Sequence, residues 1–195
     1  MARTESTMLS LGTVAPEFQL ADVSSGKLVT RGEPGENAAL LVIFLSPHCP
    51  FVKHVQAEVA RIGEDYRPKG VHIVAISAND AEQYPDDAPD KLREFGAALG
   101  LTFPVLYDET QEVAKAYRAA CTPDFFLFDS DLKLAYRGQL DSSRPKTEIP
   151  VTGADLREAL DAVLAHRPVA SEQRPSIGCN IKWKPGNEPD YFTRV

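Results

Sequence analysis

An uninterrupted apolar segment, residues 38–45 (AALLVIFL), places the strongest constraint on the fold of this chain. A run without polar alternation is typical of a strand that is buried on both faces of a sheet. The run ends at Ser46-Pro47-His48-Cys49-Pro50, and apolar residues then recur at helical spacing over residues 52–66. The sequence therefore predicts a central buried strand that turns directly into a helix.

Neighbouring segments extend this pattern into an α/β fold. We expect further strands at residues 71–77, 103–107, 124–128 and 133–137, and further helices at residues 92–99, 113–117 and 152–164. Ahead of the apolar run, residues 18–23 and 27–30 flank turn residues and predict a β-hairpin. The order of these elements predicts a central mixed sheet flanked by helices, with an N-terminal β-hairpin extension.

Two polar segments are assigned from local signals. Thr152 and Asp155 lie three residues apart and resemble a capping box at the start of the last helix. Residues 79–90 (NDAEQYPDDAPD) are acidic and rich in turn residues, so we expect a solvated loop rather than a weak cation site there.

The chain length of 195 residues is that of a single domain with a trailing arm. We expect the domain to span residues 1–166 and an irregular, proline-containing arm to span residues 167–195. Because the arm carries Trp183 and isoleucine, it is expected to pack back on the domain.

The charge balance excludes some partners. Lys and Arg number 21 and Asp and Glu 28, a net charge of −7, which argues against nucleic acid and anionic membranes as partners. Residues 1–14 lack the long apolar stretch of a secretory signal, and the longest apolar run is too short to cross a bilayer. We therefore expect a cytoplasmic protein, in which cysteines are more often catalytic than structural.

Cys49 lies where the central strand ends and the helix begins. The unpaired amide groups and the positive dipole end of a helix stabilise a thiolate and lower its pKa. Pro50 suits the first helical turn, and Lys53 and His54 add positive charge nearby. A buried cysteine can also act as a small apolar residue, but this arrangement favours a reactive thiol.

Three motifs resemble those of a known family: Ala15-Pro16-Glu17-Phe18-x-Leu20, Ser46-Pro47-His48-Cys49-Pro50, and Thr122-Pro123. Together the motifs resemble the thioredoxin-like superfamily, in particular its peroxiredoxin-like branch, the alkyl hydroperoxide reductase and thiol-specific antioxidant proteins. The resemblance implies a thioredoxin fold, Cys49 as the redox nucleophile and Pro123 as a cis-proline facing it. The supporting residues that this implies around Cys49 are Ser46, Pro47, His48, Pro50, Lys53, Thr122 and Pro123.

The chain also departs from the family patterns. Val52 stands where thioredoxins carry their second cysteine, so a C-x-x-C disulfide is excluded. Val42 replaces a proline of typical peroxiredoxins, and Pro123 stands where they place an arginine. Ser46 keeps their hydroxyl, which either bonds the Cys49 sulfur or a peroxide, or satisfies the loop backbone.

The nucleophile needs a second thiol, and two cysteines are candidates. Cys121 lies two residues before Pro123, on a loop that approaches the reactive cysteine in thioredoxin folds. Cys179 lies on the arm, in the role of a C-terminal resolving cysteine. Either cysteine could instead be incidental to the chemistry, and the sequence leaves these alternatives open.

We therefore predict a thiol-disulfide oxidoreductase or antioxidant enzyme that uses Cys49 and is resolved by Cys121 or Cys179. The alternatives are a thiol peroxidase that reduces hydroperoxides, and a non-catalytic binding module or redox sensor. The expected partners are a protein disulfide or peroxide and an external thiol reductant such as thioredoxin or glutathione. We expect that no metal or organic cofactor is required. The sequence does not decide between a monomer and a homodimer.

Overall fold

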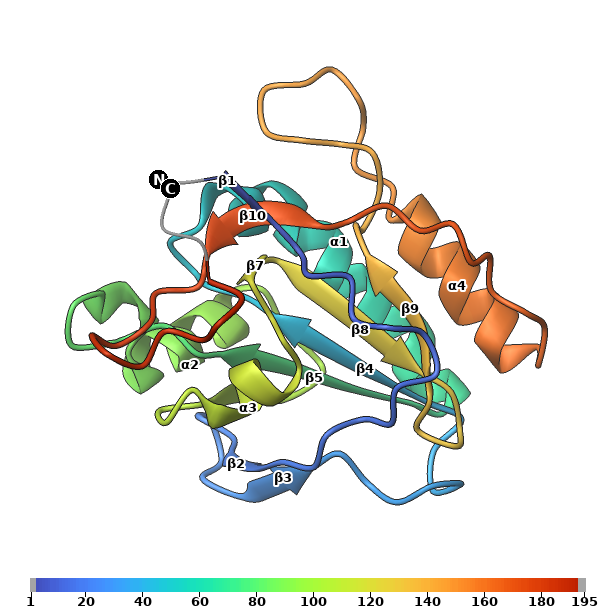
Figure 1. The fold of residues 1–195 in the computed structure, drawn as a ribbon, viewed down its shortest axis with the longest axis horizontal. Coiled ribbons are helices and arrows are strands. Elements are labelled where there is room, and N and C mark those ends of the chain that lie inside the picture. Colours follow the sequence, from blue (N-terminus) through green and yellow to red (C-terminus); the bar gives the residue numbers. More distant parts are fainter. Residues whose placement is uncertain (1–2, 193–195) are drawn as a thin grey trace.

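The computed structural model describes residues 3–192 and centres on a five-stranded mixed sheet (Figure 1). Its strand order is β6 (Val105–Tyr107), β5 (Val71–Ser77), β4 (Ala39–Phe44), β8 (Asp124–Phe128) and β9 (Leu134–Gly138). Strands β4, β5 and β6 run parallel, whereas β8 is antiparallel to β4 and β9 is antiparallel to β8. The predicted mixed sheet is confirmed.

Helices cover both faces of this sheet. The helices are α1 (Pro50–Tyr66), α2 (Pro89–Ala98), α3 (Glu112–Ala116) and α4 (Ala154–Leu164), with short 3₁₀ turns η1 (Arg67–Lys69) and η2 (Pro85–Asp87). Leu41 and Ile43 of β4 point into a core shared with α1 and α4. Leu40 and Phe44 point into the opposite core, which α3 helps to close. Both faces of β4 are therefore buried, which is why its sequence carries no polar alternation.

Two smaller sheets complete the fold. The predicted hairpin is confirmed as β2 (Gln19–Ala21) paired with β3 (Leu28–Thr30). A second sheet joins three segments far apart in the sequence, with the antiparallel order β1 (Arg3–Glu5), β10 (Ile177–Asn180) and β7 (Cys121–Thr122). Figure 1 shows β10 between β1 and β7, and β10 also contacts α1.

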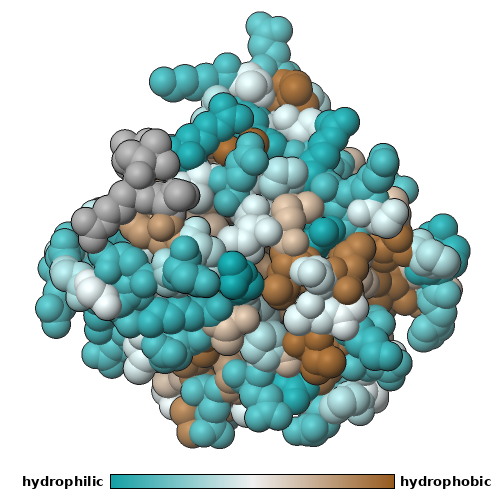
Figure 2. Space-filling model, viewed as in Figure 1, coloured by the Kyte–Doolittle hydropathy of each residue, from teal (hydrophilic) through white to brown (hydrophobic). Residues whose placement is uncertain are grey.

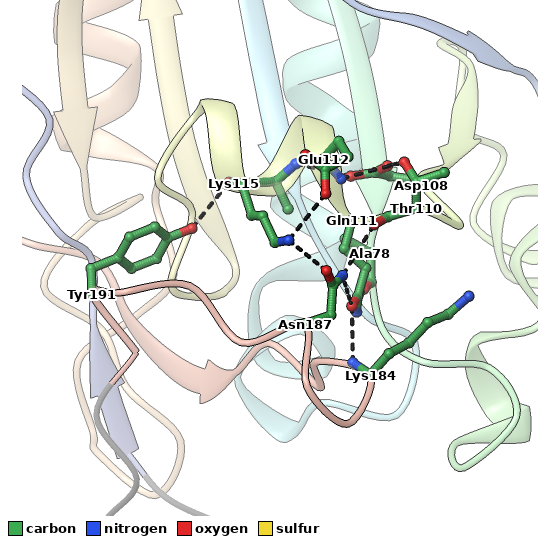
Figure 3. A network of polar contacts seen from close by, with 10 residues as sticks. Ala78, Asp108, Thr110, Gln111, Glu112, Lys115, Lys184, Asn187 and Tyr191 are labelled. Atoms are coloured by element: carbon green, nitrogen blue, oxygen red, sulfur yellow. Dashed lines mark hydrogen bonds and ion pairs between the residues drawn. The ribbon is translucent and has the colours of Figure 1, made fainter.

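The C-terminal arm is held against the rest of the chain. It is irregular apart from β10, a strand that the sequence analysis did not predict. Trp183 is buried in the core that α3 closes. The side chain of Gln111 holds the arm in place. Its Nε2 donates to the carbonyls of Ala78 (2.7 Å) and Lys182 (2.9 Å). Its Oε1 accepts a hydrogen bond from the Lys184 amide (2.9 Å; Figure 3).

Two local predictions are corrected by the structure. Helix α4 has no capping box: Gly153, at φ 67°, is its N-cap, and Asp155 instead accepts a hydrogen bond from Gln139. Residues 79–90 are not a continuous loop, because η2 forms within them and α2 already begins at Pro89. In both cases tertiary contacts decide the conformation of residues whose local signals are ambiguous.

The molecular surface in the view of Figure 2 is mostly hydrophilic, with hydrophobic side chains in small groups. Within residues 3–192, none of the helices has both the length and the apolar character needed to cross a membrane.

Candidate active site

Cys49 is the N-cap residue of α1, immediately after the turn that ends β4. Its backbone is extended (φ −69°, ψ 122°), and Pro50 occupies the start of the helix, where a missing N–H costs nothing. The Val52 amide in the first turn donates a hydrogen bond to the Cys49 sulfur. Cys49 is completely buried, so the structure encloses the thiol in the core rather than exposing it.

The segment Thr122-Pro123 faces Cys49. Its peptide bond is cis, as the family resemblance implied for Pro123. The Sγ of Cys49 donates a hydrogen bond to the main-chain oxygen of Thr122 at 3.1 Å. The start of α1 is therefore joined to the strand that precedes the cis-proline.

Cys179 is brought to the same place by strand pairing. In the antiparallel pairing of β10 with β7, Cys179 lies opposite Thr122, and its thiol is hydrogen bonded to the Cys49 sulfur. The preceding residue, Gly178, lies so close to Thr122 that a Cβ atom there would overlap the Thr122 carbonyl oxygen. A glycine is therefore required for this close approach of the two backbones.

The two thiols differ in acidity. The hydrogen bond from the Cys179 thiol lowers the pKa of Cys49, helped by hydrogen bonds from the Thr122 side chain and the Val52 amide, although burial acts in the opposite direction. The same hydrogen bond to Cys49, together with burial, raises the pKa of Cys179. The arrangement therefore favours a thiolate at Cys49 beside a protonated Cys179.

Cys121 occupies a different environment. Adjacent residues of a strand point to opposite faces, so Cys121 and Thr122 diverge, and Cys121 lies on the face away from Cys179. Its sulfur lies 3.6 Å from the Pro123 carbonyl oxygen and 3.9 Å from that of Ser176. Burial, and next the charge of Asp124, raise the pKa of the Cys121 thiol well above its usual range. None of the three cysteines forms a disulfide in this structure.

His48 is part of a polar cluster that the sequence did not reveal. Its Nδ1 lies 2.6 Å from Oδ2 of Asp87, a fully buried residue of η2. Asn79 donates to the same Asp87 oxygen at 3.0 Å. The hydrogen bond to Asp87 raises the pKa of His48 despite partial burial of the ring. Asp87 was expected to lie in a solvated loop, and no local signal distinguishes it from the exposed Asp86.

The remaining expected site residues have lesser contacts. Ser46 is fully buried, and its hydroxyl lies 3.1 Å from Nδ1 of His48. Pro47 is half-buried in the turn before Cys49. Lys53 is exposed and reaches Cys49 only through its backbone amide, which donates to the Cys49 carbonyl at 3.0 Å. Within the described residues, no group of three or more His, Cys, Asp or Glu side chains is arranged to hold a metal ion.

Comparison with known proteins gives one family match. A family model described as AhpC/TSA family matches residues 11–137. The chain is also similar to the thiol-disulfide oxidoreductase ResA of Geobacillus thermodenitrificans (strain NG80-2), at 26% identity over 67% of this chain and 70% of that protein.

Two solved structures are also similar to this chain. An uncharacterized conserved protein from Geobacillus kaustophilus has a TM-score of 0.92 at 57% identity, over 95% of this chain and 98% of that one. A thiol:disulfide interchange protein of the thioredoxin family from Chlorobium tepidum TLS has a TM-score of 0.61 at 17% identity, over 80% of this chain and 98% of that one. The second likeness shows the fold alone, and it confirms the predicted thioredoxin fold.

Proposed function

The chain belongs to the AhpC/TSA family, and from this premise we propose that it is a thiol-disulfide oxidoreductase with Cys49 as the nucleophile and Cys179 as the resolving cysteine. The observation that carries the proposal is the hydrogen bond between the Cys49 and Cys179 thiols, at the start of α1. The enclosed position of Cys121 on the other face of β7 favours Cys179 over Cys121 as the resolving thiol.

The reaction proceeds by two thiol-disulfide exchanges. The Cys49 thiolate attacks one sulfur of a substrate disulfide, the substrate S–S bond breaks, and the leaving thiolate takes up a proton. Cys179 then loses its proton and attacks the Cys49 sulfur of the mixed disulfide, which releases the second substrate thiol. The substrate is reduced by two electrons, and a Cys49–Cys179 disulfide forms. An external thiol such as thioredoxin or glutathione returns this disulfide to two thiols.

The burial of Cys49 sets a condition on this chemistry. Because β10 covers the start of α1, a protein disulfide reaches the Cys49 sulfur only after β10 moves away from β7. The close pairing of Cys179 with Thr122 belongs to the resting dithiol state. We propose a cytoplasmic location, where such a resting state stays reduced, and no metal or organic cofactor.

The second candidate is a hydroperoxide reductase, which the family and the enclosed thiolate favour. The Cys49 thiolate would cleave the O–O bond to give a sulfenic acid and an alcohol. Cys179 would then condense with the sulfenic acid, forming the disulfide and releasing water. Pro123 stands where typical peroxiredoxins have an arginine, and the Ser46 hydroxyl contacts His48, so two of their peroxide-binding groups are absent or engaged.

Four measurements test the proposal. Insulin-disulfide reduction and stopped-flow peroxide consumption are compared for wild type and Cys49→Ser, and we expect activity that the substitution abolishes. Cys179→Ser should accumulate the mixed disulfide on Cys49, whereas the matched Cys121→Ser control should turn over. Peptide mapping under non-reducing conditions should find a Cys49–Cys179 disulfide after oxidation. Equal inertness of wild type and Cys49→Ser in both assays would overturn the enzyme proposal and leave the binding module or redox sensor.

A further inference from the structure

A buried charge pair lies beside the proposed nucleophile. The side chain of Asp87 is completely enclosed, and its Oδ2 accepts from Nδ1 of His48 (2.6 Å) and Nδ2 of Asn79 (3.0 Å). Its other oxygen, Oδ1, has no hydrogen-bond partner within the described residues. A buried carboxylate is costly unless a cation compensates it, and His48 is the group placed to do so.

The imidazole ring of His48 is held from two further sides. Tyr84 stacks on the ring, with centroids 5.8 Å apart and an interplanar angle of 11°. The Ser46 hydroxyl lies 3.1 Å from Nδ1, the nitrogen that also faces Asp87. Nδ1 is thus engaged by Asp87 and Ser46, and the ring orientation is set next to Cys49, the following residue.

We propose that Asp87 is a positioning residue for Cys49: it holds the His48 ring as a cation beside the Cys49 sulfur and so supports the thiolate. The inference rests on the proposed role of Cys49. His48 directly precedes Cys49 in the chain, and the two groups interact electrostatically, because the charge of Cys49 raises the pKa of His48. By the same attraction, a cationic imidazole favours the ionised thiol.

The pair is also connected to the arm that carries Cys179. Asn79, which donates to Asp87, accepts the amide of Lys182 through its Oδ1 at 2.8 Å. The Asp80 amide donates to the Lys182 carbonyl, also at 2.8 Å. Asn79 therefore links the arm to the His48–Asp87 pair by hydrogen bonds.

The charged and titratable groups around the two residues act in different directions. Asp87 and Cys49 raise the pKa of His48, whereas the Lys182 cation lowers it. Around the Cys49 sulfur, the titratable neighbours besides His48 are Cys179, whose hydrogen bond favours the thiolate, and Cys121, whose own ionisation the Cys49 charge opposes. The hydrogen bond to Asp87 is the largest influence on the pKa of His48, so its removal should lower that pKa.

The test is the pH dependence of Cys49 alkylation by iodoacetamide, measured on the Cys49 peptide by mass spectrometry in the full-length protein. In Asp87→Asn, His48 loses its carboxylate partner and its proton at neutral pH, so the alkylation midpoint of Cys49 should rise by about one pH unit. Asp86→Asn is the matched control, because Asp86 lies in the same turn but is exposed. Equal midpoints for wild type, Asp86→Asn and Asp87→Asn would overturn the proposal.

A double-mutant cycle separates positioning from a merely structural role. His48→Gln should raise the midpoint as Asp87→Asn does, and the double variant should show no further rise, because Asp87 acts through His48. A full additional shift in the double variant would refute that route.

A titration of the His48 ring by NMR in the wild-type protein gives a reading even if Asp87→Asn does not fold. The pKa of the ring should lie above its ordinary value and should fall in Cys49→Ser, and a pKa at or below the ordinary value refutes the inference. Alkylation and ring titration need no turnover, so an inactive wild type would refute the proposed function without deciding the role of Asp87.

Discussion

The Sγ of Cys49 donates a hydrogen bond to the main-chain carbonyl of Thr122, 3.1 Å away, although the two residues are 73 positions apart in the chain. Thr122 is also the residue that Cys179 faces across the β7–β10 pair. One residue next to the cis-proline therefore organises both thiols of the proposed exchange.

The first prediction concerns the acidity of Cys49. Cys179→Ala removes the thiol that donates to the Cys49 sulfur, so the thiolate loses its main support and the pKa of Cys49 should rise by about one unit. The pH midpoint of Cys49 alkylation measures this shift. Cys121→Ala is the control, because Cys121 lies on the other face of β7, and its midpoint should match wild type. A larger shift in Cys121→Ala than in Cys179→Ala would contradict the assigned pairing.

The second prediction concerns the cover over Cys49. A methyl group at residue 178 overlaps the Thr122 carbonyl oxygen, so Gly178→Ala should force β10 away from β7. Overpacking of this kind costs roughly 1–3 kcal/mol, which predicts an increase of about 5- to 150-fold in Cys49 alkylation at a pH where the thiol is fully ionised. Ser171→Ala is the control, because Ser171 is an exposed residue of the same arm, and its alkylation rate should match wild type. An unchanged alkylation rate in Gly178→Ala would show that β10 does not limit access.

The third prediction concerns the attachment of the arm. Gln111→Ala removes the side chain that bonds the Lys182 carbonyl. The same side chain bonds the Lys184 amide (Figure 3). Leaving these groups unpaired should lower the free energy of unfolding by roughly 1–3 kcal/mol and speed amide hydrogen exchange at Lys184. Gln19→Ala, on an exposed position of β2, should change neither quantity. Protection of the Lys184 amide that survives Gln111→Ala would mean that other contacts hold the arm.

The fourth prediction concerns the start of α4. The buried carboxylate of Asp141 accepts the backbone amides of Thr152 and Gly153, each at 2.7 Å, and that of Ser143 at 2.8 Å. Burial would raise the pKa of Asp141, but the hydrogen bonds from Ser143, Gly153 and Thr152 outweigh it and the pKa is lowered. A lowered pKa stabilises the fold above the ordinary carboxyl value, and this contribution is lost as the pH falls through the pKa in the folded state.

Asp141→Asn should therefore lower the free energy of unfolding at pH 7 by roughly 1.5–3 kcal/mol, as expected for hydrogen bonds to a charged group. Urea unfolding at several pH values should show the difference from wild type shrinking in acid. The exposed Asp131→Asn should match wild type throughout. A difference that stays constant from neutral to acid pH would rule out the carboxylate as its source.

Much of the core architecture could be predicted from the order of residues. The apolar run before Cys49 marks β4, because a strand covered on both faces cannot carry polar residues. The spacing of Val52, Val55 and Val59 marks the buried side of α1, which packs on that strand. These patterns are local, because the apolar positions within each segment indicate which of its own residues are buried.

The polar parts of the site could not be predicted in the same way. Asp86 and Asp87 are neighbours in one acidic segment, yet one is exposed and the other is enclosed against His48. Thr152 and Asp155 had the spacing of a capping box, but Asp141, distant in sequence, binds the amides at that helix start instead. Whether a polar side chain is buried depends on whether it finds a hydrogen-bond partner, and here the partner lies on another element of the fold.

The sequence by itself determined the thioredoxin fold, the place of Cys49 at a helix start and its two candidate partner thiols. Only the tertiary structure decided which thiol meets Cys49. The pairing of β10 with β7 puts Cys179 opposite Thr122, and the alternation of side chains along β7 turns Cys121 away. The physical reason is that the periodic burial of a helix or strand depends on residues close together in the sequence. Strand register, in contrast, depends on contacts between segments that are far apart in the sequence.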